Sequence, residues 1–181
     1  ERTADALSFQ LSSKSWEYII ENTLLSEGKL TLYNIGSEIL AFLKKLKEKE
    51  LLSATDTYLF LDLVDDFSSE LKETHIDSDS INRNEINKLY EIPQIAEKLK
   101  NDKENYLLWS PQKEHLTISC LDPSDWISNC LKPFASSIHM SATLEPFEYY
   151  QEKIGLPKSE LSYAKGFAPG RSGAYTVACA D

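Results

Sequence analysis

The first sixty residues combine one alternating segment with two segments of helical periodicity. Leu7–Leu11 alternates apolar and polar residues, which predicts a short strand. Ser12 or Ser13 can then cap a helix, whose apolar positions follow at helical spacing: Trp16, Ile19, Ile20 and Leu24. Leu30–Tyr33 is a short bridge, after which Asn34 can cap a longer helix with the apolar stripe Ile35, Ile39, Phe42, Leu43 and Leu46.

The middle of the chain is also predicted to be helical. A third helix runs from about Thr57 to Lys72, with Leu59, Leu63, Phe67 and Leu71 on its apolar face. Residues 75–84 have almost nothing to bury and predict a mobile loop. Two short helices follow, at 85–90 and 93–100, because Pro93 is well placed in a first helical turn.

The pattern changes at Asn105. Residues 106–110 and 115–120 predict a hairpin, and residues 125–131 predict a helix that stops before Pro133. Residues 136–142 predict a buried strand, followed by a helix from Pro146 to the stop at Gly155. Strands alternating with helices are typical of an α/β layer, whereas residues 164–181 are too weakly patterned to assign.

Composition adds two constraints. The chain of 181 residues has only 6 glycines and 7 prolines, which favours long helices over a turn-rich sandwich. Its net charge of −10 argues against an isolated polyanion-binding module. The window 56–79 has eight acidic residues and one basic residue, so it holds most of this charge and predicts a solvated acidic face.

The expected compartment follows from what the sequence lacks. Its three cysteines form no CxxC pair, no apolar run approaches the length of a membrane span, and the N-terminal pattern is not that of a signal peptide. The sequence therefore predicts a soluble, reduced, intracellular protein: cytoplasmic in an archaeon, nuclear in a eukaryote.

The most informative motif is Ser141-Ala142-Thr143 at the end of the predicted strand 136–142. Small hydroxyl side chains at the carboxyl end of a core strand lie where α/β proteins place ligands. A Ser-Ala-Thr tripeptide is common, however, and an ordinary strand-to-helix turn is the better explanation when it is taken alone.

The context of the tripeptide is more specific. The strings HLTISCLDPSD (115–125), LKPF (131–134), SIHMSATLEPFEYY (137–150) and IGL (154–156) resemble XPD-type DNA repair helicases, which are superfamily-2, iron–sulfur, DEAH-type enzymes. The similarity extends over about 45 residues in matching element order. Residues 6–15 (ALSFQLSSKS) are similar to the segment that follows the DEAH box in that family.

The resemblance implies a mixed α+β chain in which a mainly helical arch insertion is flanked by strands of an incomplete, RecA-like helicase domain 1. Residues 1–25 would follow the DEAH region, 26–104 would form the arch, and 105–158 would return to helicase domain 1, with 159–181 an unassigned tail. Such helicases hydrolyse ATP and move 5′ to 3′ along single-stranded DNA. The strand passes through a hole that is bounded in part by the arch. Ser141, Ala142 and Thr143 match the motif that couples hydrolysis to strand movement.

Several family features are absent from this sequence. It has no GxxxxGK[ST] phosphate loop, no DEAH tetrad and no set of four cysteines for a cluster. We therefore expect no cofactor and no ATP hydrolysis in this chain alone. The resemblance implies ATP, magnesium and a 4Fe–4S cluster for the parent helicase, and nucleotide excision repair as its setting.

The expected partners are single-stranded DNA, through the parent, and repair proteins that dock on the arch, with no membrane. The candidate phosphate contacts are Lys44, Lys45, Lys47 and Arg83, although Glu48 and Glu50 dilute the lysine cluster. The alternative function is a free-standing helical module whose acidic face binds a basic partner.

Two other kinds of site are less favoured by the residue pattern. Tyr106, Trp109 and Trp126 could stack on bases, but their leucine neighbours favour core positions. A metal site at Cys120 and His115 is disfavoured, because residues five apart in a strand point to opposite faces.

Overall fold

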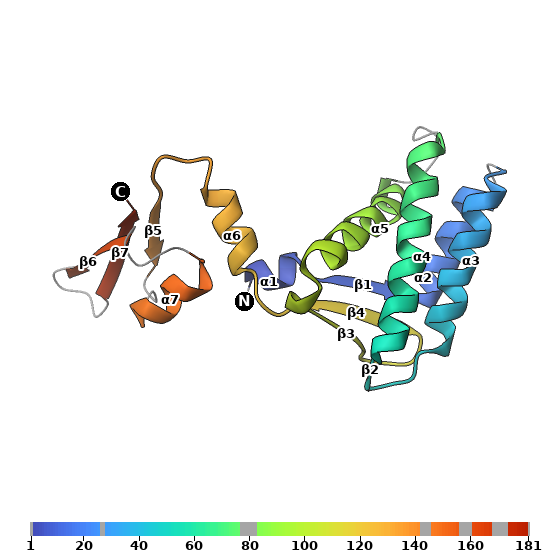
Figure 1. Ribbon diagram of the computed structural model, residues 1–181, viewed down its shortest axis with the longest axis horizontal. Coiled ribbons are helices and arrows are strands. Elements are labelled where there is room, and N and C mark those ends of the chain that lie inside the picture. Colours follow the sequence, from blue (N-terminus) through green and yellow to red (C-terminus); the bar gives the residue numbers. More distant parts are fainter. Residues whose placement is uncertain are drawn as a thin grey trace. The chain divides into compact units, whose positions relative to one another are not determined.

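The computed structural model describes residues 2–25, 28–76, 83–141, 146–155, 161–167 and 174–180. The chain divides into two compact units, residues 1–121 and 122–181. The boundaries that the resemblance implies, after residues 25, 104 and 158, stay a prediction. The elements of the N-terminal unit (Figure 1) are α1 (Arg2–Ala6), β1 (Phe9–Ser12), α2 (Ser13–Ile19), the π-helix η1 (Ile20–Leu25), α3 (Leu30–Lys45), β2 (Glu50–Leu51), α4 (Ala54–Glu73), α5 (Arg83–Asp102), the 3₁₀ turn η2 (Lys103–Asn105), β3 (Tyr106–Ser110) and β4 (His115–Cys120).

The strands of this unit form one antiparallel sheet in the order β1-β4-β3-β2. The predicted hairpin is confirmed, with Leu108 opposite Ile118 across β3 and β4. The predicted first strand is confirmed as β1, which pairs with β4 although α2, η1, α3, α4 and α5 intervene in the sequence. The fold is thus mixed α+β, as expected.

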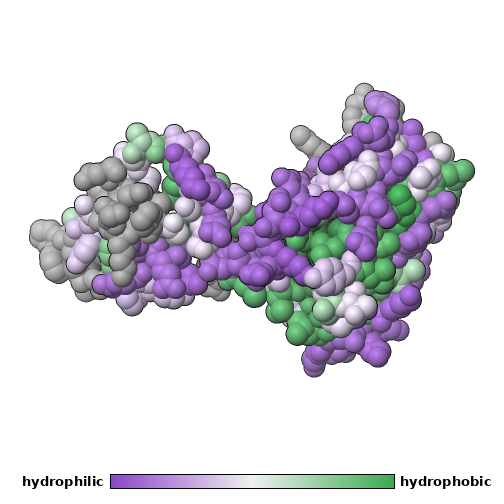
Figure 2. Space-filling model, in the orientation of Figure 1, coloured by the Kyte–Doolittle hydropathy of each residue, from purple (hydrophilic) through white to green (hydrophobic). Residues whose placement is uncertain are grey.

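One face of the sheet packs on the helices. Leu116 and Ile118 of β4 are buried in the core, together with Leu11 of β1. The residues that alternate with them, such as Gln10, project to the opposite face. Large apolar side chains also remain on the surface of this unit, among them Leu51, Tyr58, Leu59 and Leu107. Figure 2 shows hydrophobic areas among hydrophilic ones on this unit.

Helix α2 begins as predicted. Ser12 has extended backbone angles, and its side chain accepts a hydrogen bond from the Ser15 N–H at 3.2 Å. Trp16 is 1% exposed, packs edge-on against Phe67 at 5.3 Å between ring centroids, and donates from Nε1 to the Gly36 carbonyl at 2.8 Å. This side chain therefore joins α2, α3 and α4.

Two predictions for α3 and α4 are corrected. Asn34 does not cap α3, which begins a turn earlier at Leu30, because Leu32 is buried in the core and stabilises the extra turn. Helix α4 is confirmed and is capped by Ser53, but Leu59 is 48% exposed. Phe60 occupies the core position instead.

Helix α5 is a single helix of 20 residues rather than two short ones. Pro93 lies inside it and cannot donate the backbone hydrogen bond of its turn, which costs about 3 kcal/mol in an isolated helix. Leu89, Ile92 and Ile95 on either side of Pro93 are each fully buried. Burying three such side chains contributes about 5–9 kcal/mol, so tertiary packing maintains the helix across the proline.

The C-terminal unit consists of α6 (Ser124–Leu131), β5 (Ile138–Ser141), α7 (Phe147–Lys153), β6 (Leu161–Phe167) and β7 (Ala174–Ala180). The two helices confirm the prediction, and the previously unassigned tail contributes β6 and β7. The strands form an antiparallel sheet in the order β5-β7-β6.

The prediction that β5 is a buried strand is wrong for Ile138, which is 67% exposed. The physical reason is that a strand side chain stands out from the face of its sheet, so it is buried only where other residues cover that face. The apolar character of this strand predicted burial, but the described residues do not cover Ile138.

Candidate functional site

The Ser-Ala-Thr segment begins at the end of β5. Ser141 is the last residue of β5, and α7 begins six residues later at Phe147. Ala142 and Thr143, and the side chain of Ser141, lie outside the described residues. Of the motif, the structure thus describes the Ser141 backbone, at the end of β5.

A three-residue hydrogen-bonded bridge joins those two elements. His139 on β5 is bonded through Nε2 to Ser137 Oγ at 2.9 Å and through Nδ1 to Tyr150 Oη of α7 at 2.6 Å. The His139 and Tyr150 rings also meet edge-on, with 5.9 Å between centroids. The bridge joins β5, which precedes residues 142–145, to α7, which follows them. The sequence does not predict this pair, because strand and helix periods alone do not bring residues 139 and 150 together.

The order of these groups resembles nucleophile, base and orienting group, but the third group is unsuited to that chemistry. Burial raises the pKa of Tyr150 above its ordinary value, so the phenol stays neutral at neutral pH. A neutral hydroxyl stabilises a charged imidazolium much less than a carboxylate does. The bridge therefore positions β5 and α7 and does not activate Ser137.

Replacing Tyr150 with phenylalanine is expected to destabilise the C-terminal unit by about 1 kcal/mol, because one hydrogen bond to His139 is lost while the ring is retained. Hydrogen exchange of β5 and α7, followed by mass spectrometry, measures the change. Tyr149→Phe is the matched control: Tyr149 is 60% exposed, and its neighbour Lys153 contacts the ring, which phenylalanine keeps. Equal protection in the two variants would contradict the bridge.

Of the basic residues predicted to contact phosphate, Lys44 is already bonded to a carboxylate. Lys44 Nζ lies 2.6 Å from Glu17 Oε1, and this hydrogen bond raises the pKa of Lys44. Lys45 and Lys47 are exposed, and the Lys47 backbone N–H donates to Glu50 Oε2 at 3.1 Å. Arg83 is the first residue of α5, and its side chain lies outside the described residues. Carboxylates next to the lysines oppose binding of a polyanion.

The cysteines do not match the ligand set of a 4Fe–4S cluster. Cys120 is buried on β4 and Cys130 is exposed on α6, while Cys179 belongs to β7. A 4Fe–4S cluster takes four thiolates, and this chain has three cysteines in three separate elements. In the described part of the chain, no three His, Cys, Asp or Glu side chains gather as a metal-binding group.

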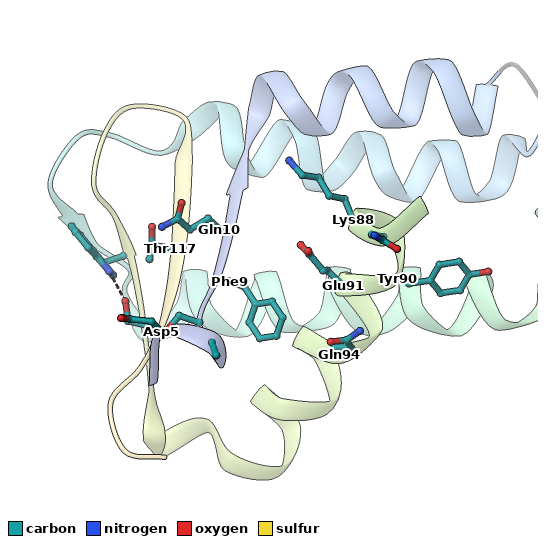
Figure 3. A pocket seen from close by; sticks show the side chains of 13 residues that line it. Asp5, Phe9, Gln10, Lys88, Tyr90, Glu91, Gln94 and Thr117 are labelled. Carbon is teal, nitrogen blue, oxygen red and sulfur yellow. Dashed lines mark hydrogen bonds between the residues drawn. The ribbon is translucent and has the colours of Figure 1, made fainter. Parts of the chain in front are cut away.

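A cleft in the N-terminal unit was not anticipated from the sequence. The cleft has a volume of about 1070 Å³ and lies between β1 and α5. Figure 3 shows that Lys88 and Glu91 extend from α5 toward β1, whereas Tyr90 points away from the strand. The remaining lining is rich in amides and hydroxyls: Gln10, Asn87, Gln94, Thr117 and Ser119, with Asp5, Phe9 and Trp109. No sequence signal marks this cleft, because its two walls are about 80 residues apart in the chain.

Trp109 and Ser119 stabilise the far wall of the cleft. Trp109 donates from Nε1 to Ser119 Oγ at 3.0 Å, which links β3 to β4 on the face away from the core.

The other two aromatic residues considered for base stacking lie elsewhere. Tyr106 of β3 is half-buried, and burial raises its pKa. Trp126 of α6 is 47% exposed, contrary to the predicted core position.

No protein-family model, curated protein or solved structure matches the chain. Within the described residues, no helix is both long enough and apolar enough to cross a membrane.

Proposed function

We propose that the chain is part of an ATP-dependent 5′–3′ DNA helicase of the XPD type, in which residues 26–104 form the arch and the Ser141–Thr143 segment couples ATP hydrolysis to strand movement. The proposal begins from the strings of residues 115–156 that resemble this family. Its main geometric support is the pairing of β1 with β4, because an insertion must leave and re-enter its host domain at neighbouring positions.

The pairing meets that requirement. Phe9 lies opposite Ile118 and Leu11 opposite Leu116, while the helices α3, α4 and α5 lie between these strands in the sequence. The chain thus leaves one strand, builds a helical segment and returns beside the strand that it left. This is the connectivity expected of an arch inserted into a helicase domain.

The RecA-like part of the proposal needs strands from the parent. All strand pairs in the described structure are antiparallel, whereas a RecA-like core is a mostly parallel sheet. The edge position of β5, where Ile138 is exposed, leaves room for a strand of the parent protein beside β5.

The catalytic elements would also come from the parent protein. The 181 residues alone should therefore show no DNA-stimulated ATPase and only weak, salt-sensitive binding of single-stranded DNA.

The gene sequence upstream of Glu1 is the most direct test. The proposal requires a phosphate loop, four cysteines and a DEAH tetrad in the same reading frame, in that order. An upstream segment of unrelated character, or a natural start codon there, would exclude the helicase assignment.

In a full-length parent, Thr143→Ala should slow unwinding at least about tenfold. The reason is that the variant loses one hydrogen bond of the Thr143 hydroxyl, worth about 1.5 kcal/mol, which is made during the coupling step. Affinity for single-stranded DNA should stay close to that of the parent, because the coupling residue does not bind the strand. Strand-displacement and fluorescence anisotropy assays measure the two properties. Thr143→Ser keeps the hydroxyl and should restore unwinding; if the alanine variant unwinds normally, Thr143 does not couple.

One observation favours the alternative, an acidic module that binds a basic partner. Asp56, Asp62 and Asp66 of α4 are exposed, whereas Asp65 is paired with Lys100 at 2.8 Å. If this function is correct, the isolated chain should capture a lysine-rich peptide, and replacing the three exposed aspartates with asparagine should abolish the capture.

A further inference from the structure

The outer edge of β1 is open. β1 is the first strand in the sheet order β1-β4-β3-β2, and the described residues provide no strand on its other side. An edge strand presents backbone N–H and C=O groups that can pair with an added strand. Recognition by strand addition uses this edge for affinity and neighbouring side chains for specificity.

A groove borders this edge: the cleft of about 1070 Å³ beside α5 is lined by Phe9 and Gln10 of β1. A second hollow of about 550 Å³ lies on α2 and is lined by Ser12, where β1 ends. Lys88 of α5 lines the groove, and its Nζ donates to Ser15 Oγ at 2.8 Å. A groove beside an open strand edge suits an extended polypeptide, which can pair with the strand.

The charges along the groove indicate which side chains it would accept. Glu91 extends from α5 toward β1 in the first hollow, and burial raises its pKa, which the nearby Lys88 offsets only in part. Asp5 also lines that hollow, and the charged residues of the second are Lys14, Glu17 and Glu21. A cationic side chain beside Glu91 would compensate a half-buried carboxylate, because opposite charges stabilise each other more strongly where water is partly excluded.

We propose that the groove along β1 binds an extended segment of another polypeptide, which adds a strand to the sheet and places a lysine or arginine side chain beside Glu91. The bound backbone pairs with the free edge of β1, and Lys88 turns from Ser15 to donate to a carbonyl of the peptide. The carboxylates that attract this cation also disfavour nucleic acid in the same groove, since phosphates would lie next to Asp5 and Glu91.

The test uses the whole chain and fluorescein-labelled eight-residue peptides of alternating threonine and valine with one central lysine. The lysine peptide should bind at least about tenfold more tightly than the same peptide with a central glutamate. N-methylation of alternate backbone nitrogens should abolish binding, because it removes the strand pairing without changing the side chains.

Matched protein variants locate the contact. Glu91→Gln should weaken binding of the lysine peptide about tenfold, while Glu97→Gln, an exposed position on the same helix outside the groove, should leave it unchanged. Glu91→Lys should reverse the preference toward the glutamate peptide. The proposal is overturned if no peptide binds at millimolar concentration, if N-methylation or Glu91→Gln has no effect, or if a labelled oligo(dT) binds the groove and competes with the peptide.

Discussion

Trp16→Ala is expected to destabilise the N-terminal unit by about 3–5 kcal/mol, the cost of removing a large buried aromatic side chain. Trp16 is 1% exposed, lies against Phe67 and donates a hydrogen bond to the Gly36 carbonyl. Alanine would leave a cavity where α2, α3 and α4 meet, and these rigid helices can fill it only in part. Urea unfolding followed by far-ultraviolet circular dichroism measures the loss.

Trp126→Ala serves as the control for that measurement. Trp126 is 47% exposed on α6, so its replacement should change stability by no more than about 0.5–1 kcal/mol. If the two variants unfold at the same urea concentration, Trp16 is not the junction of the three helices.

Gly155→Ala is expected to destabilise the C-terminal unit by about 2–5 kcal/mol. Gly155 follows α7 with φ at +69°, a left-handed conformation that costs an L-residue about 1–2 kcal/mol. A Cβ atom there would also lie 2.6 Å from the Ser124 carbonyl oxygen, and relieving such a contact costs about 1–3 kcal/mol more. The obstacle is backbone, so a side-chain rotation cannot relieve it. Hydrogen exchange of α6 and α7 measures the effect.

Gly28→Ala separates the two contributions. Gly28 has nearly the same conformation, with φ at +72°, but a Cβ atom added to it would meet nothing within 4 Å. This variant should therefore lose only the conformational part, about 1–2 kcal/mol, and the loss should fall on the N-terminal unit. Equal losses in the two variants would show that the contact with Ser124 contributes nothing.

The parts of the fold that the sequence predicts well are those determined by neighbouring residues. Ser12 caps α2 because its hydroxyl accepts a hydrogen bond from the free backbone N–H of Ser15, three residues along the chain. The hairpin of β3 and β4 follows from two strand-like segments with a short connection, and Gly155 ends α7 because glycine tolerates a positive φ.

The errors arise where distant residues decide the outcome. Pro93 lies within α5 because Leu89, Ile92 and Ile95 are buried against other helices, and no local rule contains that packing. Ile138 has the composition of a core strand residue, yet the described chain does not cover it. At the candidate site, the sequence identifies the motif but not the bond between His139 and Tyr150, which exists only once α7 packs against β5.

The pairing of β1 with β4 also sets an order of events during synthesis. Ser13 and Glu114, which are hydrogen-bonded at this junction, are 101 residues apart in sequence. At about 5–20 residues per second, β1 leaves the ribosome about 5–20 s before its partner strand has been made. The intervening helices can form within microseconds, so they are complete long before the sheet closes. Closure of the sheet over β1 is therefore the late, slow step in folding of the N-terminal unit, and β1 remains without a partner on either edge until β4 emerges.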